Sequence, residues 1–180
     1  MRIRNDQSAA VVVDIQERLF PHIHEHEQLA ANVVRLIQGL HILDIPMWVT
    51  QQYTKGLGPT IAPVREVLGE APVLEKMTFS CCGAPGLMEA LQESGRRNII
   101  LFGIEAHACV LQTAIDLLEA GYHPVVVEDC ISSRRPNDKQ VAVARMRQEG
   151  ATITTYESLL LELCVEAGTE RFKSISKIIK

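Results

Sequence analysis

Three side chains with the potential for nucleophilic catalysis follow short apolar segments of the chain: Asp14, Lys76 and Cys109. A cysteine is a strong nucleophile only as a thiolate, so its pKa must fall below that of a free thiol. A helix beginning near His107 would place Cys109 in its first turn, and we expect this position and Lys76 to lower the thiol pKa. Asp14 can then carry the thiol proton to a leaving amine while first-turn N–H groups hold the oxyanion. This chemistry hydrolyses amides or esters.

Each of the three residues also has an ordinary structural interpretation. Asp14 can cap the following turn, Lys76 can be a solvated loop residue, and Cys109 can be a small buried core residue. Their occurrence together at three segment ends favours a site over three separate structural roles.

The segments that must position these residues are short, apolar and rich in β-branched side chains. They are apolar almost without alternation, as strands covered on both faces of a parallel sheet require. Ligands of such sheets bind at the carboxyl ends of the strands, where the three residues lie. The predicted strands are Ala9–Ile15, Ile45–Thr50, Pro72–Leu74, Asn98–Phe102, Pro124–Glu128 and Ala151–Thr154.

Stretches with helical spacing separate the predicted strands, so the fold class is α/β. We expect a Rossmann-like, doubly wound, six-stranded parallel sheet with helices on both faces, forming a single domain over residues 1–180. The segment carrying Phe172, Ile175, Ile178 and Ile179 is predicted to be an amphipathic helix. It packs either on its own domain or on a second subunit, and we expect a homo-oligomer.

Composition excludes several other classes of protein. Lys and Arg number 18 against 22 Asp and Glu, a net charge of −4, which disfavours a nucleic-acid partner. The apolar run Ala9–Val13 is too short for a signal peptide or a membrane span. Five cysteines without a C-x-x-C pair indicate reduced thiols, and we expect a cytoplasmic protein. The turn Asp14-Ile15-Gln16-Glu17 lacks the G-x-G-x-x-G pattern of dinucleotide-binding enzymes.

Three motifs together resemble the isochorismatase-like family of cysteine hydrolases. They are Val11-Val12-Val13-Asp14-Ile15-Gln16, Glu75-Lys76-Met77-Thr78-Phe79-Ser80 and Gly103-Ile104-Glu105-Ala106-His107-Ala108-Cys109-Val110. The resemblance spans nearly the whole chain. It implies an Asp14-Lys76-Cys109 triad, and it implies a non-proline cis peptide bond, which we place at Ile104–Glu105. N–H groups around this bond and at Ala108 are expected to face the substrate carbonyl.

The resemblance also bears on cofactors. Nicotinamidases of the family carry an Asp-x-His metal site after the second strand, but here the stretch reads Thr50-Gln51-Gln52-Tyr53-Thr54. Neutral amides do not replace a carboxylate and an imidazole around a divalent ion, so we expect no metal and no other cofactor. The chain is most similar to the isochorismatase-domain-containing subgroup. Glu105 either faces the pocket, where it would disfavour anionic substrates, or pairs with an arginine.

The predicted function is a metal-independent cysteine hydrolase of a small amide-type molecule that acts through a covalent thioester. The alternatives are an isochorismatase-type vinyl ether hydrolase and a non-catalytic binding or scaffold protein of the same fold. The aromatic members of the expected pocket can equally belong to the core, and His107 either orients substrate or supports the site. The residues expected to line the pocket are Gln16, Phe20, Gln52, Tyr53, Phe79 and His107.

Overall fold

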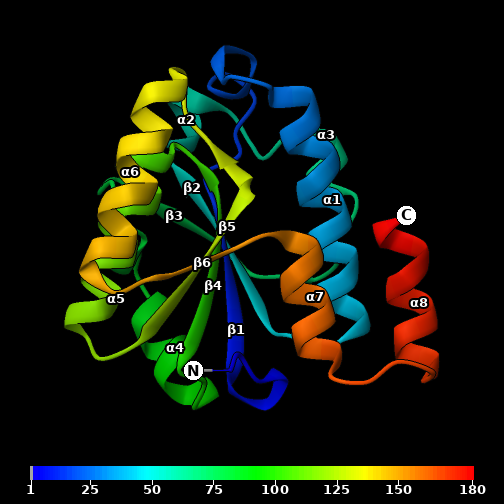
Figure 1. Cartoon of the computed structure of the whole chain (residues 1–180). Helices are drawn as coiled ribbons and strands as arrows, with labels where there is room; N and C mark the ends of the chain where they lie inside the picture. The colour runs from blue at the N-terminus through cyan, green and yellow to red at the C-terminus, as the bar shows by residue number, and fades with distance from the viewer. Residues whose placement is uncertain (1) are drawn as a thin grey trace.

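A computed structural model, which describes residues 2–180, has a six-stranded, entirely parallel sheet at its centre (Figure 1). The order across the sheet is β3-β2-β1-β4-β5-β6. The predicted fold class is therefore confirmed. The strands are β1 (Ser8–Val13), β2 (Met47–Gln52), β3 (Val73–Lys76), β4 (Asn98–Ile104), β5 (His123–Ser132) and β6 (Thr152–Thr154).

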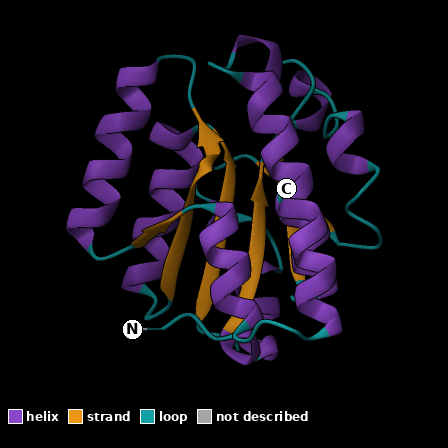
Figure 2. Cartoon of the chain, turned by 45° about the vertical axis from the view of Figure 1, so that its right-hand side comes forward, coloured by secondary structure: helices purple, strands orange, loops and turns teal. Residues whose placement is uncertain are grey.

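Helices cover both faces of this sheet, as its apolar strands require. In Figures 1 and 2, α1, α7 and α8 lie on one face, and α4, α5 and α6 lie on the other. A π-helical turn, Ala106–Val110, leads directly into α5. The helices are α1 (His26–Ile42), α2 (Thr54–Leu57), α3 (Ala62–Arg65), α4 (Leu87–Ser94), α5 (Leu111–Glu119), α6 (Pro136–Glu149), α7 (Tyr156–Cys164) and α8 (Glu170–Ile179).

The chain adds β2 and β3 on one side of β1 and its last three strands on the other, so the strand order reverses between β1 and β4. The chain moves outward from β1 through β2 to β3, then returns to the other side of β1 and continues through β4, β5 and β6. In doubly wound sheets the loops on either side of such a reversal diverge and leave a crevice at the carboxyl ends of the strands. Asp14 and the π-helical turn, which follow β1 and β4, lie at this point.

The C-terminal helix α8 packs on its own domain. It lies against α1 and α7, and Ile175 on its apolar face is fully buried (Figure 1). Of the two packing partners expected from the sequence, the chain's own core is the one observed. No helix within residues 2–180 combines the length and apolar character needed to cross a bilayer.

Candidate active site

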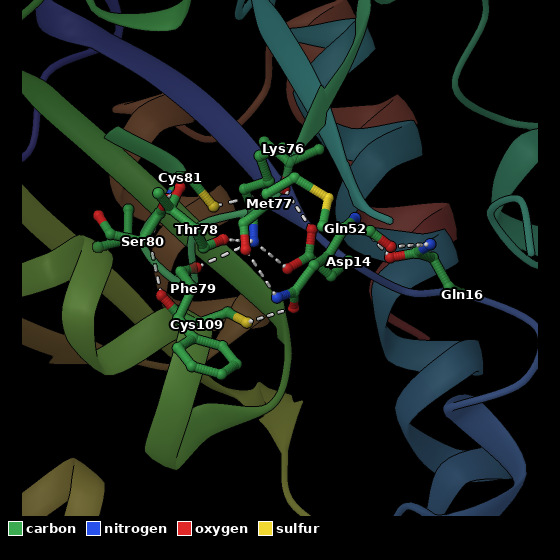
Figure 3. A network of polar contacts seen from close by, with 12 residues as sticks. Asp14, Gln16, Gln52, Lys76, Met77, Thr78, Phe79, Ser80, Cys81 and Cys109 are labelled. Atoms are coloured by element: carbon green, nitrogen blue, oxygen red, sulfur yellow. Dashed lines mark hydrogen bonds and ion pairs between the residues drawn. The ribbon is translucent and has the colours of Figure 1, made fainter. Parts of the chain in front are cut away.

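The carboxyl ends of β1 and β3 bring Asp14 and Lys76 into direct contact. The parallel registers pair Val13 with Thr50 and Gln52 with Lys76, so the ends of β1, β2 and β3 lie side by side. The ammonium Nζ of Lys76 lies 2.6 Å from Oδ2 of Asp14, and both side chains are buried. Figure 3 shows the two side chains directed toward each other.

Lys76 uses all three of its N–H donors within the protein. Besides Asp14, its Nζ donates to the carbonyl oxygens of Thr78 at 3.0 Å and Phe79 at 2.9 Å. Burial alone lowers the pKa of the lysine, but the neighbouring Asp14 and the thiols of Cys81 and Cys109 raise it, and the net shift is upward. Lys76 is therefore a fixed cation and not a proton donor near neutral pH.

Thr50 and Cys81 complete the surroundings of the Asp14 carboxylate. The Thr50 hydroxyl donates to Oδ1 of Asp14 at 2.8 Å and lies 3.4 Å from the Cys81 thiol. Cys81 is fully buried, and burial raises its pKa to about 12. Neither residue was predicted as part of the site, although Thr50 ends the second predicted strand and the strand-end rule applies to it equally.

Gly103 allows β4 to approach β1 directly beside Asp14. Its φ is +127°, and a Cβ at this position would lie 2.1 Å from the carbonyl oxygen of Val13. Only glycine fits so close to a neighbouring backbone. The pairing of β4 with β5 is also irregular between Leu101 and Gly103. The glycine thereby sets the path of the chain into the turn that carries Cys109.

Cys109 lies in the π-helical turn and is only 4% exposed. Its thiol is 3.6 Å from Oε1 of Gln52, which Figure 3 shows beside it. Burial raises the pKa of the Cys109 thiol, Asp14 raises it further, and the opposing effect of Lys76 is smaller. The prediction of a lowered pKa is wrong, because it counted the nearby cation and the helix terminus but not the burial or the carboxylate.

The backbone of the turn offers fewer free donors than expected. The Ile104–Glu105 peptide bond is cis. The N–H of Ala108 donates to the carbonyl of Glu105 at 3.1 Å, as does that of Val110 at 3.2 Å. Ala108 is therefore occupied within the turn and is not available to a substrate oxygen. Among the described residues no hydrogen bond is formed by the N–H of Glu105.

The Glu105 carboxylate pairs with an arginine, which is the second of its two expected orientations. Its Oε2 accepts the backbone N–H of Arg134 at 3.0 Å and the Nε–H at 3.2 Å. His107 follows the same side of the turn, and its Nδ1 lies 2.9 Å from the Ser133 hydroxyl. Both side chains thus form hydrogen bonds with the β5–α6 loop. Among the described residues the His107 side chain forms its hydrogen bond with that loop and not with Cys109.

The two glutamines behave differently from each other. Gln16 is fully buried, and its amide nitrogen donates to the carbonyls of Gln52 and Gly58 while its oxygen accepts the N–H of Gln52. It cannot line a pocket, because these bonds use its side chain to fasten β2 to the following loops. Gln52 does reach the site, with its oxygen near Cys109 and its nitrogen 3.3 Å from the carbonyl of Met77.

Among the predicted pocket aromatics, Phe20 belongs to the core. It is 8% exposed, and its ring meets that of His26 edge to face at 5.4 Å. Phe79 and Tyr53 are instead about half exposed, and Met77 is 71% exposed. Met77 was not predicted, but it lies in the same motif as Lys76. Met77 and Phe79 follow Lys76 in the chain, and the backbone N–H of Tyr53 donates to the carbonyl of Lys76 at 3.0 Å. We refer to these three exposed residues as the apolar rim.

The amide side chain of Gln51, near the end of β2, forms hydrogen bonds within the protein. Gln51 donates to the Thr60 hydroxyl at 2.9 Å and accepts from Thr54 at 3.3 Å.

Within residues 2–180 no cluster of three or more His, Cys, Asp or Glu side chains is arranged to hold a metal ion. All five cysteines are free thiols.

Comparison of the sequence with known proteins gives similarity over almost the entire chain. The profile described as the isochorismatase domain matches residues 8–158. Mouse isochorismatase domain-containing protein 2A is 42% identical over 180 residues, which is 99% of this chain and 85% of the mouse protein.

Solved structures give the same result at the level of the fold. A structure described as the MAR1 ribonuclease from Caenorhabditis elegans has a TM-score of 0.94 and 40% identity, covering 99% of this chain and 92% of that one. The YcaC gene product of Escherichia coli, described as an octameric hydrolase of unknown specificity, has a TM-score of 0.93. It is 21% identical and covers 99% of this chain and 89% of its own, so it bears on the fold alone.

Proposed function

The chain belongs to the isochorismatase family, and from that premise we propose that it is a metal-independent cysteine hydrolase of a small, uncharged amide. The observation that carries the proposal is the buried Asp14–Lys76 pair, 2.6 Å apart, with the thiol of Cys109 close enough to be electrostatically coupled to both. A carboxylate, a cation and a thiol so placed supply a base, a fixed positive charge and a nucleophile.

In the first half of the reaction Asp14 takes the proton from the Cys109 thiol as Sγ attacks the amide carbonyl carbon. We expect the oxyanion that forms to be held by the N–H of Glu105, which forms no hydrogen bond among the described residues, together with the N–H of Cys109. When the C–N bond breaks, Asp14 returns the proton to the leaving amine, and a thioester remains on Cys109. The raised thiol pKa fits this order, because the thiol stays protonated until the base acts.

In the second half a water molecule attacks the thioester carbonyl and loses its proton to Asp14. The C–S bond breaks, the carboxylic acid leaves, and the proton on Asp14 returns to the thiolate. Lys76 does not transfer a proton in either half. It holds the Asp14 carboxylate in position and offsets the negative charge that passes between Asp14 and Sγ.

The rim of Tyr53, Met77 and Phe79 and the pairing of Glu105 with Arg134 favour an uncharged, partly apolar substrate. A buried carboxylate beside the nucleophile also disfavours a substrate that carries its own negative charge near the carbonyl. We therefore do not favour the vinyl ether of isochorismate, which carries carboxylates, although cysteine-independent hydrolysis of such a bond is the leading alternative.

The test is turnover of a panel of small amides, their methyl esters, a vinyl ether and a short RNA by the intact protein. Products are measured by liquid chromatography, and the protein is quenched in acid for intact-mass analysis. The wild type and a Cys164→Ala control are expected to release amine and to show an acyl adduct on the peptide containing Cys109. Cys109→Ala is expected to do neither.

Two outcomes would contradict the proposal. Undiminished turnover by Cys109→Ala would show that the thiol is dispensable and would favour the vinyl ether alternative or RNA cleavage, according to the substrate consumed. Absence of turnover and of adduct with every member of the panel would favour the binding or scaffold alternative.

We also propose that the protein forms a homo-oligomer in which a second copy covers part of the apolar rim. The exposed side chains of Met77 and Phe79 support this, since large apolar groups gathered on a surface commonly mark an interface. Light scattering on the purified protein would give the subunit number, and Met77→Glu is expected to reduce it. A cytoplasmic location stays a prediction.

A further inference from the structure

A hollow lies among the amino ends of the strands, at the end of the sheet away from the triad. Its volume is about 530 Å³, within the range of small-molecule sites. In Figure 1 the amino end of β1 lies near the letter N, and the arrowheads mark the carboxyl ends of the strands. Asp14 follows β1 and Lys76 ends β3, so the triad lies at the end of the sheet with the arrowheads. The residues that give it its character are Arg2, Arg4, Arg97, Asn98, Tyr122 and His123.

The sheet register explains why cations gather there. Ser8 of β1 pairs with Asn98 of β4, which pairs with His123 of β5. The N–H of Arg97 donates to Gln7 at 3.0 Å, and the N–H of His123 donates to Arg97 at 2.8 Å. The three segments that enter β1, β4 and β5 are thus laid side by side, and each contributes a basic residue.

The positive charge of the hollow is not neutralised by the protein. Its lining residues include no Asp or Glu, and within residues 2–180 neither Arg4 nor Arg97 forms an ion pair. The Arg97 guanidinium lies 5.9 Å from the centroid of the Tyr122 ring, which helps to fix its position. This is notable in a chain whose net charge is −4.

Asn98 adds a hydrogen-bonding group to the wall of the hollow. It is 4% exposed and belongs to the lining. Its amide nitrogen can donate to an oxygen-rich ligand while the arginines bind the charge of that ligand.

We propose that this hollow binds a small phosphorylated ligand, at a site separate from the triad. Guanidinium groups match the geometry of phosphate oxygens and bind them with two parallel N–H donors. Arg4 and Arg97 line one space and form no ion pair within residues 2–180, although Arg97 also donates to the carbonyl of Gly121 at 3.5 Å. Two such guanidinium groups suit a phosphate or diphosphate group. The inference does not depend on the activity proposed for the triad.

The test is isothermal titration of inorganic pyrophosphate into the full-length protein at low ionic strength. We expect a saturable isotherm for the wild type. Arg4→Gln and Arg97→Gln are each expected to weaken binding about tenfold or more, since each removes a charge-assisted contact. Asn98→Ala is expected to weaken it by a smaller factor. The matched control is Arg147→Gln, which removes an exposed arginine on α6 and is expected to have no effect.

A second readout places the ligand. Amide chemical shifts of Gly121, Tyr122 and His123 are expected to move on addition of pyrophosphate, and those of Cys109 are expected to stay unchanged. Three results would overturn the proposal: no binding, equal weakening by Arg147→Gln, or binding of a short RNA at this edge in the absence of any pyrophosphate binding. The last would assign the surface to nucleic acid.

Discussion

Removing either member of the Asp14–Lys76 pair is expected to destabilise the protein more than removing both. The two charges are 2.6 Å apart with side chains at most 1% exposed. At an effective dielectric constant of about 20, their attraction is on the order of 6 kcal/mol. Desolvation of the two ions offsets most of this, but a single unpaired charge left in the same place costs about 3–5 kcal/mol.

The assay is urea unfolding of four proteins at neutral pH: wild type, Asp14→Asn, Lys76→Met and the double variant. Each single variant is expected to lose about 3–5 kcal/mol of unfolding free energy. The double variant is expected to lose less than either single variant, because neither partner is left charged and alone. Losses that add within about 0.5 kcal/mol would refute the reasoning, since they would mean that the charges are not coupled.

The pH dependence of the same measurement gives a second check on Lys76. Its pKa is raised in the folded protein above the ordinary value of 10.5. A group with a raised folded pKa contributes stability that is fully present below its unfolded pKa and is lost as the pH passes through the folded pKa. The difference in unfolding free energy between wild type and Lys76→Met should be constant from pH 7 to 9 and decline above about pH 10.5. A decline between pH 7 and 9 would contradict the assignment of Lys76 as a fixed cation.

Three further predictions concern the surroundings of this pair. The rate at which iodoacetamide labels Cys109, measured by peptide mass spectrometry, should still rise with pH above pH 9, while Cys81 stays unlabelled. A labelling rate that levels off below pH 8 would contradict the raised thiol pKa. Gly103→Ala should lower the free energy of unfolding in urea by about 3 kcal/mol or more, and Gly121→Ala by about 1 kcal/mol, because Gly121 also has a positive φ but its added Cβ would meet nothing within 4 Å. Equal losses would rule out the clash. Glu105→Gln should lower the free energy of unfolding by only about 1 kcal/mol, because its partner Arg134 is largely exposed, and it should raise the rate of amide hydrogen exchange in the β5–α6 loop. An unchanged exchange rate would show that the carboxylate does not hold the loop.

The sheet could be predicted from the sequence because its strands are apolar on both faces, but the strand ends could not. Ile45 was assigned to the second strand on its side-chain type, yet its N–H donates to Leu40, which makes it part of the turn that ends α1. β5 continues through Ile131 and Ser132, beyond the predicted end at Glu128. This extension depends on the irregular pairing at Gly103, which no local pattern of residues reveals.

For the site, the positions of Asp14, Lys76 and Cys109 could be predicted by their place at strand ends, and the directions of their neighbours could not. Asp14 has a left-handed φ of +47°, which its residue type does not predict. In the turn that follows, Gln16 and Phe20 are buried and fall outside the expected pocket. The sign of the Cys109 pKa shift depends on how deeply the thiol is covered. Burial results from the packing of several segments, and short motifs do not encode it.

The bonds made by Lys76 have a consequence for how such an enzyme can acquire new specificity. The ammonium binds the carbonyl oxygens of Thr78 and Phe79, not their side chains. The backbone path of this loop is therefore constrained by its hydrogen bonds with the buried ammonium. The identity of the exposed side chain at position 79 is not constrained, because that side chain takes no part in these bonds. Libraries that vary Phe79 and Met77 at constant loop length should yield folded proteins with altered substrate preference, and insertions or deletions in the same loop should yield inactive ones.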